Sequence, residues 1–133
     1  MVFEYELQTP RGGFLDITAQ VSEAVAKFCE ETGRTEASCL VFCPHTTAAV
    51  TVNENADPDV QHDLLIALEK AFPDRPEFLH SEGNSAAHAK SSCVGVSEQL
   101  IVKGGSLLLG TWQGIYFCEF DGPRRRRFFV QVN

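Results

Sequence analysis

Residues 37–71, ASCLVFCPHTTAAVTVNENADPDVQHDLLIALEKA, decide the fold, because two strand patterns run directly into a helix pattern. The continuous apolar run at residues 37–43 predicts a buried strand. After Pro44 and His45, apolar and polar side chains alternate, so a second strand is expected with one face toward a core. The residues expected on that face are Ala48, Val50 and Val52.

A helix is predicted directly after this second strand. Asp57 suits an N-cap, and Pro58 suits the first helical position, where no backbone N–H is needed. Its apolar stripe consists of Val60, Leu64, Ala67, Leu68 and Ala71. An earlier helix is predicted by a similar stripe from Val21 to Cys29, with Gly33 as its C-terminal stop.

The last third of the chain is rich in strand patterns. Gly104-Gly105 joins two of them and predicts a hairpin. Residues 115–120 and 125–132 flank Asp121-Gly122-Pro123, which predicts a second paired ribbon. Residues 2–8 alternate in the same way at the start of the chain.

Asn84 can cap a short helix that runs through His88 and Lys90. We therefore expect an α+β fold with a largely antiparallel or mixed β-sheet, two main helices and one short helix. The length fits a single domain over residues 1–133.

Composition limits the classes of protein that this chain can represent. It is 44% hydrophobic and 22% charged, has no apolar run that could span a bilayer, and begins without the basic-then-apolar pattern of a secretion signal. We therefore expect a cytoplasmic protein without a membrane partner.

Five scattered cysteines without a C-x-x-C pair predict buried free thiols. Cys43 is the possible exception, because it lies two residues before His45 and could form a cysteine–histidine nucleophile pair with it.

The net charge of −7 argues against nucleic-acid binding, which depends on neutralising phosphates. The exception is the run Arg124-Arg125-Arg126-Arg127. We favour pairing of these arginines with acidic groups in this chain or a neighbouring subunit. An anion-binding edge is the alternative.

Three of the four histidines lie at the edges of predicted elements among small polar residues. His45 precedes Thr46-Thr47, and His80 and His88 flank Gly83-Asn84. Small neighbours leave room for a ligand and supply hydroxyl and backbone donors. Imidazoles that converge from separate segments could hold one zinc ion with an open position, a catalytic arrangement. The alternative is three unrelated surface histidines.

Further polar residues are candidates for binding or catalysis. Asp57 is explained as a cap, and Asp59 gains about 0.3–1 kcal/mol from the helix dipole, so both are weaker candidates as metal ligands. Glu54 is explained either by pairing with a buried partner or by a direct role in binding or catalysis. Lys90 could hold a phosphate as a point charge. The glycines around Trp112-Gln113 predict tight backbone geometry that presents those two side chains.

Three stretches together resemble the YjbQ-like family, also described as secondary thiamine-phosphate synthases. They are HTTAAVTVNENADPDV at 45–60, the histidine-containing segment at 80–92, and GTWQGIYFCEFDGPRRRR at 110–127. The resemblance covers essentially the whole chain. It implies a small α+β homotrimer with polar motif residues near subunit contacts. It also implies a weak ability to join a pyrimidine diphosphate to a thiazole phosphate, with release of pyrophosphate.

The resemblance and the residue patterns together give the expected site. The expected catalytic residues are His45, Glu54 and His88. The expected substrate-binding residues are Thr46, Thr47, Asn53, Asn84, Lys90, Trp112 and Gln113. The expected ligands of a divalent metal, Mg²⁺ or Zn²⁺, are His45, His80 and His88, with Asp57 and Asp59 as weaker candidates.

The thiazole nitrogen is itself the nucleophile of that reaction, which fits a chain without an obvious serine or cysteine nucleophile motif. Two other functions remain open from the sequence. One is a zinc hydrolase that uses the three histidines. The other is a non-catalytic module that binds a small phosphorylated metabolite.

Overall fold

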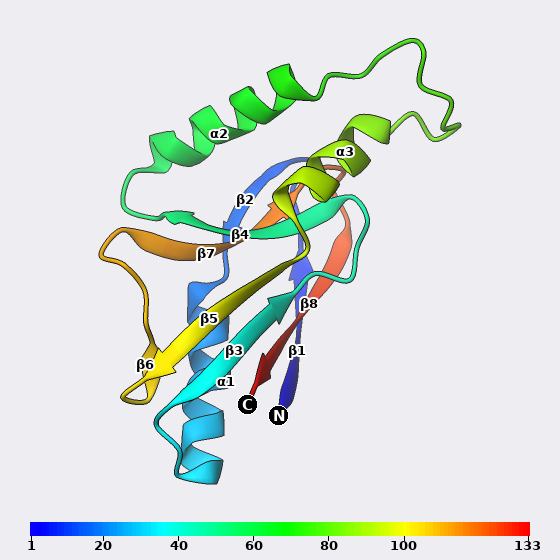
Figure 1. The fold of residues 1–133 in the computed structure, drawn as a ribbon. Coiled ribbons are helices and arrows are strands. Elements are labelled where there is room, and N and C mark those ends of the chain that lie inside the picture. Colours follow the sequence, from blue (N-terminus) through cyan, green and yellow to red (C-terminus); the bar gives the residue numbers. More distant parts are fainter.

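Two antiparallel sheets and three helices make up the computed structural model, which describes residues 1–133 (Figure 1). The helices are α1 (Thr18–Thr32), α2 (Pro58–Ala71) and α3 (Ser85–Val94). The strands are β1 (Val2–Gln8), β2 (Gly13–Asp16), β3 (Ala37–Phe42), β4 (Ala48–Glu54), β5 (Ser97–Lys103), β6 (Ser106–Leu107), β7 (Gln113–Glu119) and β8 (Arg125–Val132). The larger sheet has the order β1-β8-β3-β5-β6, and the smaller has the order β2-β7-β4. Every pairing is antiparallel, so the predicted α+β class is confirmed.

The apolar core lies between α1 and the two sheets. α1 ends at Gly33, whose φ of 71° is the left-handed conformation typical of a helix C-terminus. Phe117 of β7 and Phe128 of β8 are fully buried, and their ring centroids lie 6.4 Å apart, so the two rings bridge the sheets. The buried residues of α1 are those of the predicted stripe, Val21, Ala24, Val25 and Phe28.

α2 is less buried than its sequence pattern predicts. Asp57 caps the helix as expected, since its Oδ1 accepts the Asp59 N–H at 2.9 Å. No residue of α2 is fully buried, however, and Figure 1 shows the helix at the periphery of the molecule. Its apolar stripe is therefore only partly covered within one chain. None of the three helices has the length and hydropathy needed to span a membrane.

The prediction of a fully buried strand over residues 37–43 is only half correct. In β3, Cys39 and Val41 are buried, but Phe42 is 39% exposed. The reason is that the covered face of the larger sheet takes every second side chain, and the other face of β3 has no layer over it. A continuous apolar run therefore does not mean burial on both faces here.

The predicted ribbon of residues 115–120 with 125–132 is wrong. β7 pairs with β2 and β4, while β8 pairs with β1 and β3 in the other sheet. The turn at Asp121-Gly122-Pro123 therefore carries the chain from one sheet to the other. A Cβ at Gly122 would overlap the Pro10 carbonyl oxygen, so this position requires glycine.

The remaining sequence predictions are confirmed for one hairpin and differ from the structure for α3 and one cysteine. The Gly104-Gly105 hairpin is confirmed by the pairing of Lys103 with Ser106. α3 extends past Lys90 to Val94, so it is longer than predicted. All five cysteines are free, but Cys93 on α3 is exposed, so the expectation of buried thiols does not hold there.

Replacing Phe128 with alanine should lower the free energy of unfolding by about 3–5 kcal/mol, because a cavity would replace a fully buried ring. The matched control is Phe78→Ala, which removes a ring that is 40% exposed and should change stability by less than about 0.5 kcal/mol. Urea unfolding followed by circular dichroism measures both. Equal losses in the two variants would contradict this description of the core.

Candidate functional site

A polar cavity of about 410 Å³ lies where three segments meet at one end of the molecule. The segments are the loop between β3 and β4, the loop before α3 with its first turn, and the start of β8, which Figure 1 shows close together. Apart from one proline, every lining residue is polar or charged. The lining residues are Pro44, His45, Thr46, Thr47, His80, Glu82, Asn84, His88, Arg124 and Arg126.

His45 is held by the backbone of β8. The last pairing of β3 with β8 joins Phe42 and Phe129. Beyond it, the His45 side chain binds the backbone of Arg127 on β8. Its Nε2 lies 3.0 Å from the Arg127 amide nitrogen and 3.1 Å from the Arg127 carbonyl oxygen. Because the backbone N–H can only donate, Nε2 is its acceptor, and the neutral ring carries its proton on Nδ1. Burial, and then the nearby charge of Arg126, lower the pKa of His45 and favour this neutral form.

The other two cavity histidines lie together at the start of α3. The ring centroids of His80 and His88 are 5.4 Å apart, with their planes nearly perpendicular. Asn84, at the N-cap position of α3, does not cap the helix as predicted. Its Nδ2 donates instead to the Asp121 carboxylate at 2.8 Å, and its Oδ1 is buried without a partner. This bond ties the start of α3 to the turn before β8.

The structure brings the three predicted metal ligands His45, His80 and His88 to one cavity. No group of three or more histidine, cysteine, aspartate or glutamate side chains lies close enough to hold a metal ion, however. The three-histidine metal site therefore stays a prediction. The fourth histidine, His62, is exposed on α2.

A buried ion pair supports the wall of the cavity. Arg126 Nε and Nη2 donate to the two carboxylate oxygens of Glu119 at 2.8 and 2.7 Å, and the side chains are 6% and 0% exposed. Thr9 and the backbone N–H of Asp121 also donate to this carboxylate. Burial alone would raise the pKa of Glu119, but the hydrogen bonds from Arg126 and Thr9 outweigh burial and lower it. Arg126 Nη2 also donates to Thr47 Oγ1 at 2.8 Å, which fixes that hydroxyl at the cavity.

Sequence reasoning did not select Glu119. The available signal was a lone carboxylate inside the apolar run of β7, since such a group requires a buried partner.

Pairing of the whole arginine run is confirmed. Arg124 binds Asp121, Arg125 binds Glu6 and Arg127 binds Glu4, at 2.8, 2.6 and 3.3 Å.

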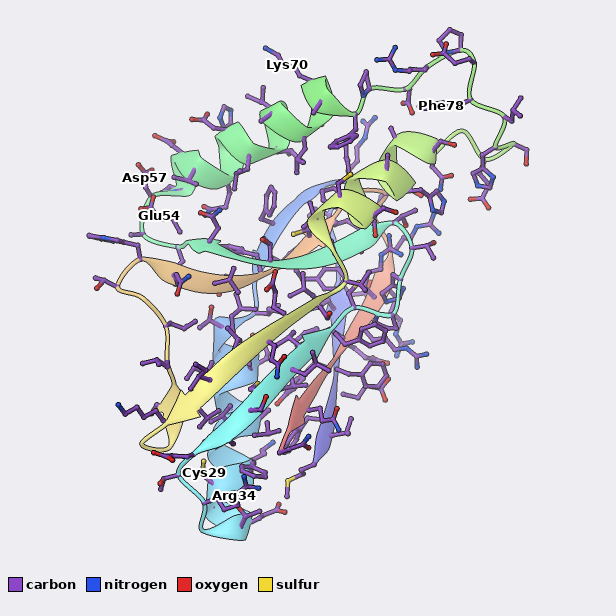
Figure 2. The ribbon with its side chains drawn as sticks, viewed as in Figure 1. Cys29, Arg34, Glu54, Asp57, Lys70 and Phe78 are labelled. Atoms are coloured by element: carbon purple, nitrogen blue, oxygen red, sulfur yellow. The ribbon has the colours of Figure 1, made fainter.

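A second group of predicted site residues lies away from this cavity. Glu54 pairs with Gln113 at the far ends of β4 and β7, and β4 alone spans about 20 Å at the usual rise per residue. Figure 2 shows Glu54 and Asp57 on the opposite side of the molecule from Phe78, which precedes the His80 loop. The predicted residues in this group are Asn53, Glu54, Asp57, Asp59, Trp112 and Gln113.

Two other candidates are also placed elsewhere. Lys90 lines a neighbouring cavity of about 490 Å³, which shares Asn84 with the histidine-lined cavity. Cys43 is buried beside His45, and burial raises the pKa of its thiol to about 11. A protonated, buried thiol does not support the cysteine–histidine nucleophile pair.

Comparisons with known proteins give one consistent family. A family model described as UPF0047 protein YjbQ-like matches residues 3–133. The UPF0047 protein YugU of Bacillus subtilis is 52% identical over 125 residues, which cover 93% of this chain and 92% of that protein. A UPF0047 protein of Methanocaldococcus jannaschii is 47% identical and covers 99% of this chain and 94% of its own.

Solved structures agree with these relatives. A crystal structure of an uncharacterised YjbQ/UPF0047 protein from Clostridium acetobutylicum matches with a TM-score of 0.91 and 52% identity over 98% of this chain and 99% of that one. A conserved hypothetical protein from Thermus thermophilus matches with a TM-score of 0.89 and 42% identity over the same shares.

The lowered pKa of His45 predicts a measurable pH effect on stability. The unfolded ring titrates near 6.5 and the folded ring below it, so the contribution of His45 is complete above pH 6.5. It decreases as the pH falls toward the folded pKa. His45→Gln keeps an acceptor for the Arg127 N–H and should flatten the loss of unfolding free energy between about pH 7 and pH 5. Urea unfolding across that range measures the slope. His62→Gln is the control, and a slope unchanged in both variants would show that His45 is not held neutral.

Proposed function

The chain belongs to the UPF0047 YjbQ-like family, and on that premise we propose that it is a transferase of the thiamine-phosphate synthase type. In this reaction the thiazole nitrogen attacks the methylene carbon of the pyrimidine diphosphate. A carbon–nitrogen bond forms, the carbon–oxygen bond to the diphosphate breaks, and pyrophosphate leaves with the electron pair. The step needs groups that stabilise the departing anion.

The observation that carries this proposal is the chemistry of the histidine-lined cavity. Its lining contains three imidazoles, two guanidinium groups and two threonines, with Glu82 as its only carboxylate. Hydrogen-bond donors aimed at the position where charge develops stabilise a leaving diphosphate. A cavity with this lining suits phosphoryl oxygens better than an apolar ligand.

His88 and His80 are suited to assist the leaving group. Imidazoles can donate a proton or a hydrogen bond to a departing phosphoryl oxygen near neutral pH. The proposed step uses only the side chains that line this cavity. A Mg²⁺ ion that accompanies the diphosphate belongs to the substrate, as Mg²⁺ commonly binds through substrate phosphates.

We also propose that the chain functions as a homotrimer, as the resemblance implies. Large apolar side chains support self-association, since Leu79 is 98% exposed, Trp112 is 62% exposed and α2 has no fully buried residue. The distance between Glu54 and the cavity supports it as well. Contact between subunits offers a way for the Glu54–Gln113 end of one chain to approach the cavity of another.

The synthase proposal predicts that thiamine phosphate and pyrophosphate form above the uncatalysed rate when both precursors and Mg²⁺ are supplied. His88→Gln should lower kcat by about 10²-fold, because it removes a proton donor from the cavity. His62→Gln, an exposed histidine outside the cavity, is the matched control and should keep full activity. Product chromatography measures all three proteins.

Two results would contradict the proposal. No product above background from the unchanged protein would exclude the synthase reaction. Stabilisation by the substrates without turnover would indicate a phosphometabolite-binding module instead.

Light scattering during gel filtration should give three times the chain mass. Leu79→Asp places a charge on a nearly fully exposed apolar side chain and should shift the population toward smaller species. A single-chain mass at micromolar concentration would contradict the homotrimer.

A further inference from the structure

Arg126 differs from its strand neighbours Arg125 and Arg127 in the direction of its side chain. Side chains alternate along β8, so Arg125 and Arg127 face outward and pair with glutamates of β1. Arg126 faces inward, is 6% exposed and lines the cavity. The same alternation places it against Glu119 of β7.

The guanidinium of Arg126 is only partly satisfied by the protein. Its Nε and Nη2 bind Glu119 and Thr47, while Nη1 makes no hydrogen bond to any group of the chain. A guanidinium has five N–H donors, and Nη1 is not among the fully buried unpaired atoms, so it can reach a group in the cavity. A nine-tenths buried side chain with a free terminal nitrogen at a polar cavity is therefore arranged to meet an acceptor that the chain does not supply.

Thr47 provides a second free donor beside it. Its side chain is also buried, with the residue 5% exposed, and its Oγ1 accepts from Arg126 Nη2 at 2.8 Å. Because that oxygen is already an acceptor, its own hydroxyl hydrogen is directed elsewhere, and no group of the chain accepts it. His45 also lines this cavity, and its neutral ring carries a proton on Nδ1.

We propose that Arg126 and Thr47 form a receptor for a phosphoryl group in this cavity, with Glu119 as the positioning residue that fixes the guanidinium. Donors from three residues on two separate segments, the loop between β3 and β4 and the start of β8, suit a tetrahedral anion with several oxygens better than a carboxylate with two. The bidentate bond to Glu119 sets the orientation of Nη1 before a ligand arrives, so little conformational entropy of the side chain is lost on binding. The inference rests on the proposed function in taking this cavity as the substrate site, but it predicts anion binding with or without turnover.

Calorimetric titration with pyrophosphate, inorganic phosphate and acetate tests the receptor. The unchanged protein should bind pyrophosphate and phosphate and should not bind acetate measurably. Arg126→Lys keeps the positive charge beside Glu119 but loses the forked donors, and it should weaken pyrophosphate binding about tenfold or more. Thr47→Val removes one hydroxyl at nearly constant volume and should weaken binding by about fivefold.

Arg125→Lys is the matched control, because Arg125 is the outward-facing neighbour on the same strand and does not line the cavity. It should bind pyrophosphate as the unchanged protein does. If Arg126→Lys fails to fold by circular dichroism, the Thr47→Val titration alone decides the result.

The possible results separate this inference from the synthase proposal. Weakened binding in the cavity variants without any turnover in the unchanged protein would support the receptor and exclude the synthase. Turnover with unchanged affinity in both cavity variants would support the synthase and overturn the receptor. Absence of pyrophosphate binding, or equal binding of acetate, would also overturn it.

Discussion

The buried pair of Arg126 and Glu119 is the interaction on which the site depends. It joins β8 of the larger sheet to β7 of the smaller sheet, with Glu119 fully buried and Arg126 6% exposed at the cavity. Burying two charges is favourable only when their remaining hydrogen-bonding capacity is met. Here Thr9, Thr47 and the backbone of Asp121 supply most of those bonds. Removing one partner of such a pair typically costs about 3–5 kcal/mol.

The consequences of this pair extend to each segment of the cavity. On one side it fixes Thr47, and with it the loop that carries His45. On the other side it fixes the turn at Asp121, whose carboxylate holds Asn84 at the start of α3. His88 lies on the first turns of that helix. The ion pair and its hydrogen bonds therefore tie together the loop that carries His45 and the start of α3, the helix that carries His88.

Local patterns predicted the elements well and their arrangement less well. The Asp57 cap, the Gly33 stop and the Gly104-Gly105 hairpin depend on neighbouring residues, so the sequence contains the whole cause. The partners of β7 and β8 are set by long-range packing. The turn between them does not indicate that β7 already has β2 and β4 as its two neighbours. Long-range contacts also decide the role of Asn84. Its sequence position predicts a helix cap, but in the structure its side chain binds Asp121.

The candidate site was predicted in part for the same reason. Small polar neighbours marked His45, His80 and His88 as candidates, and the structure places all three in the lining of one cavity. Glu119 was missed because its importance comes from a partner in another sheet. Glu54 was grouped with the histidines by proximity in sequence, but an extended strand separates nearby residues by about 3.3 Å per position.

A crystal structure of the protein grown with pyrophosphate would test the role of this cavity most directly. We expect density for the anion between His45 and His88, with one of its oxygens within hydrogen-bond distance of Arg126 Nη1. The bidentate bond between Arg126 and Glu119 should be unchanged. Pyrophosphate bound elsewhere on the surface, with this cavity holding only water, would contradict the assignment of the site.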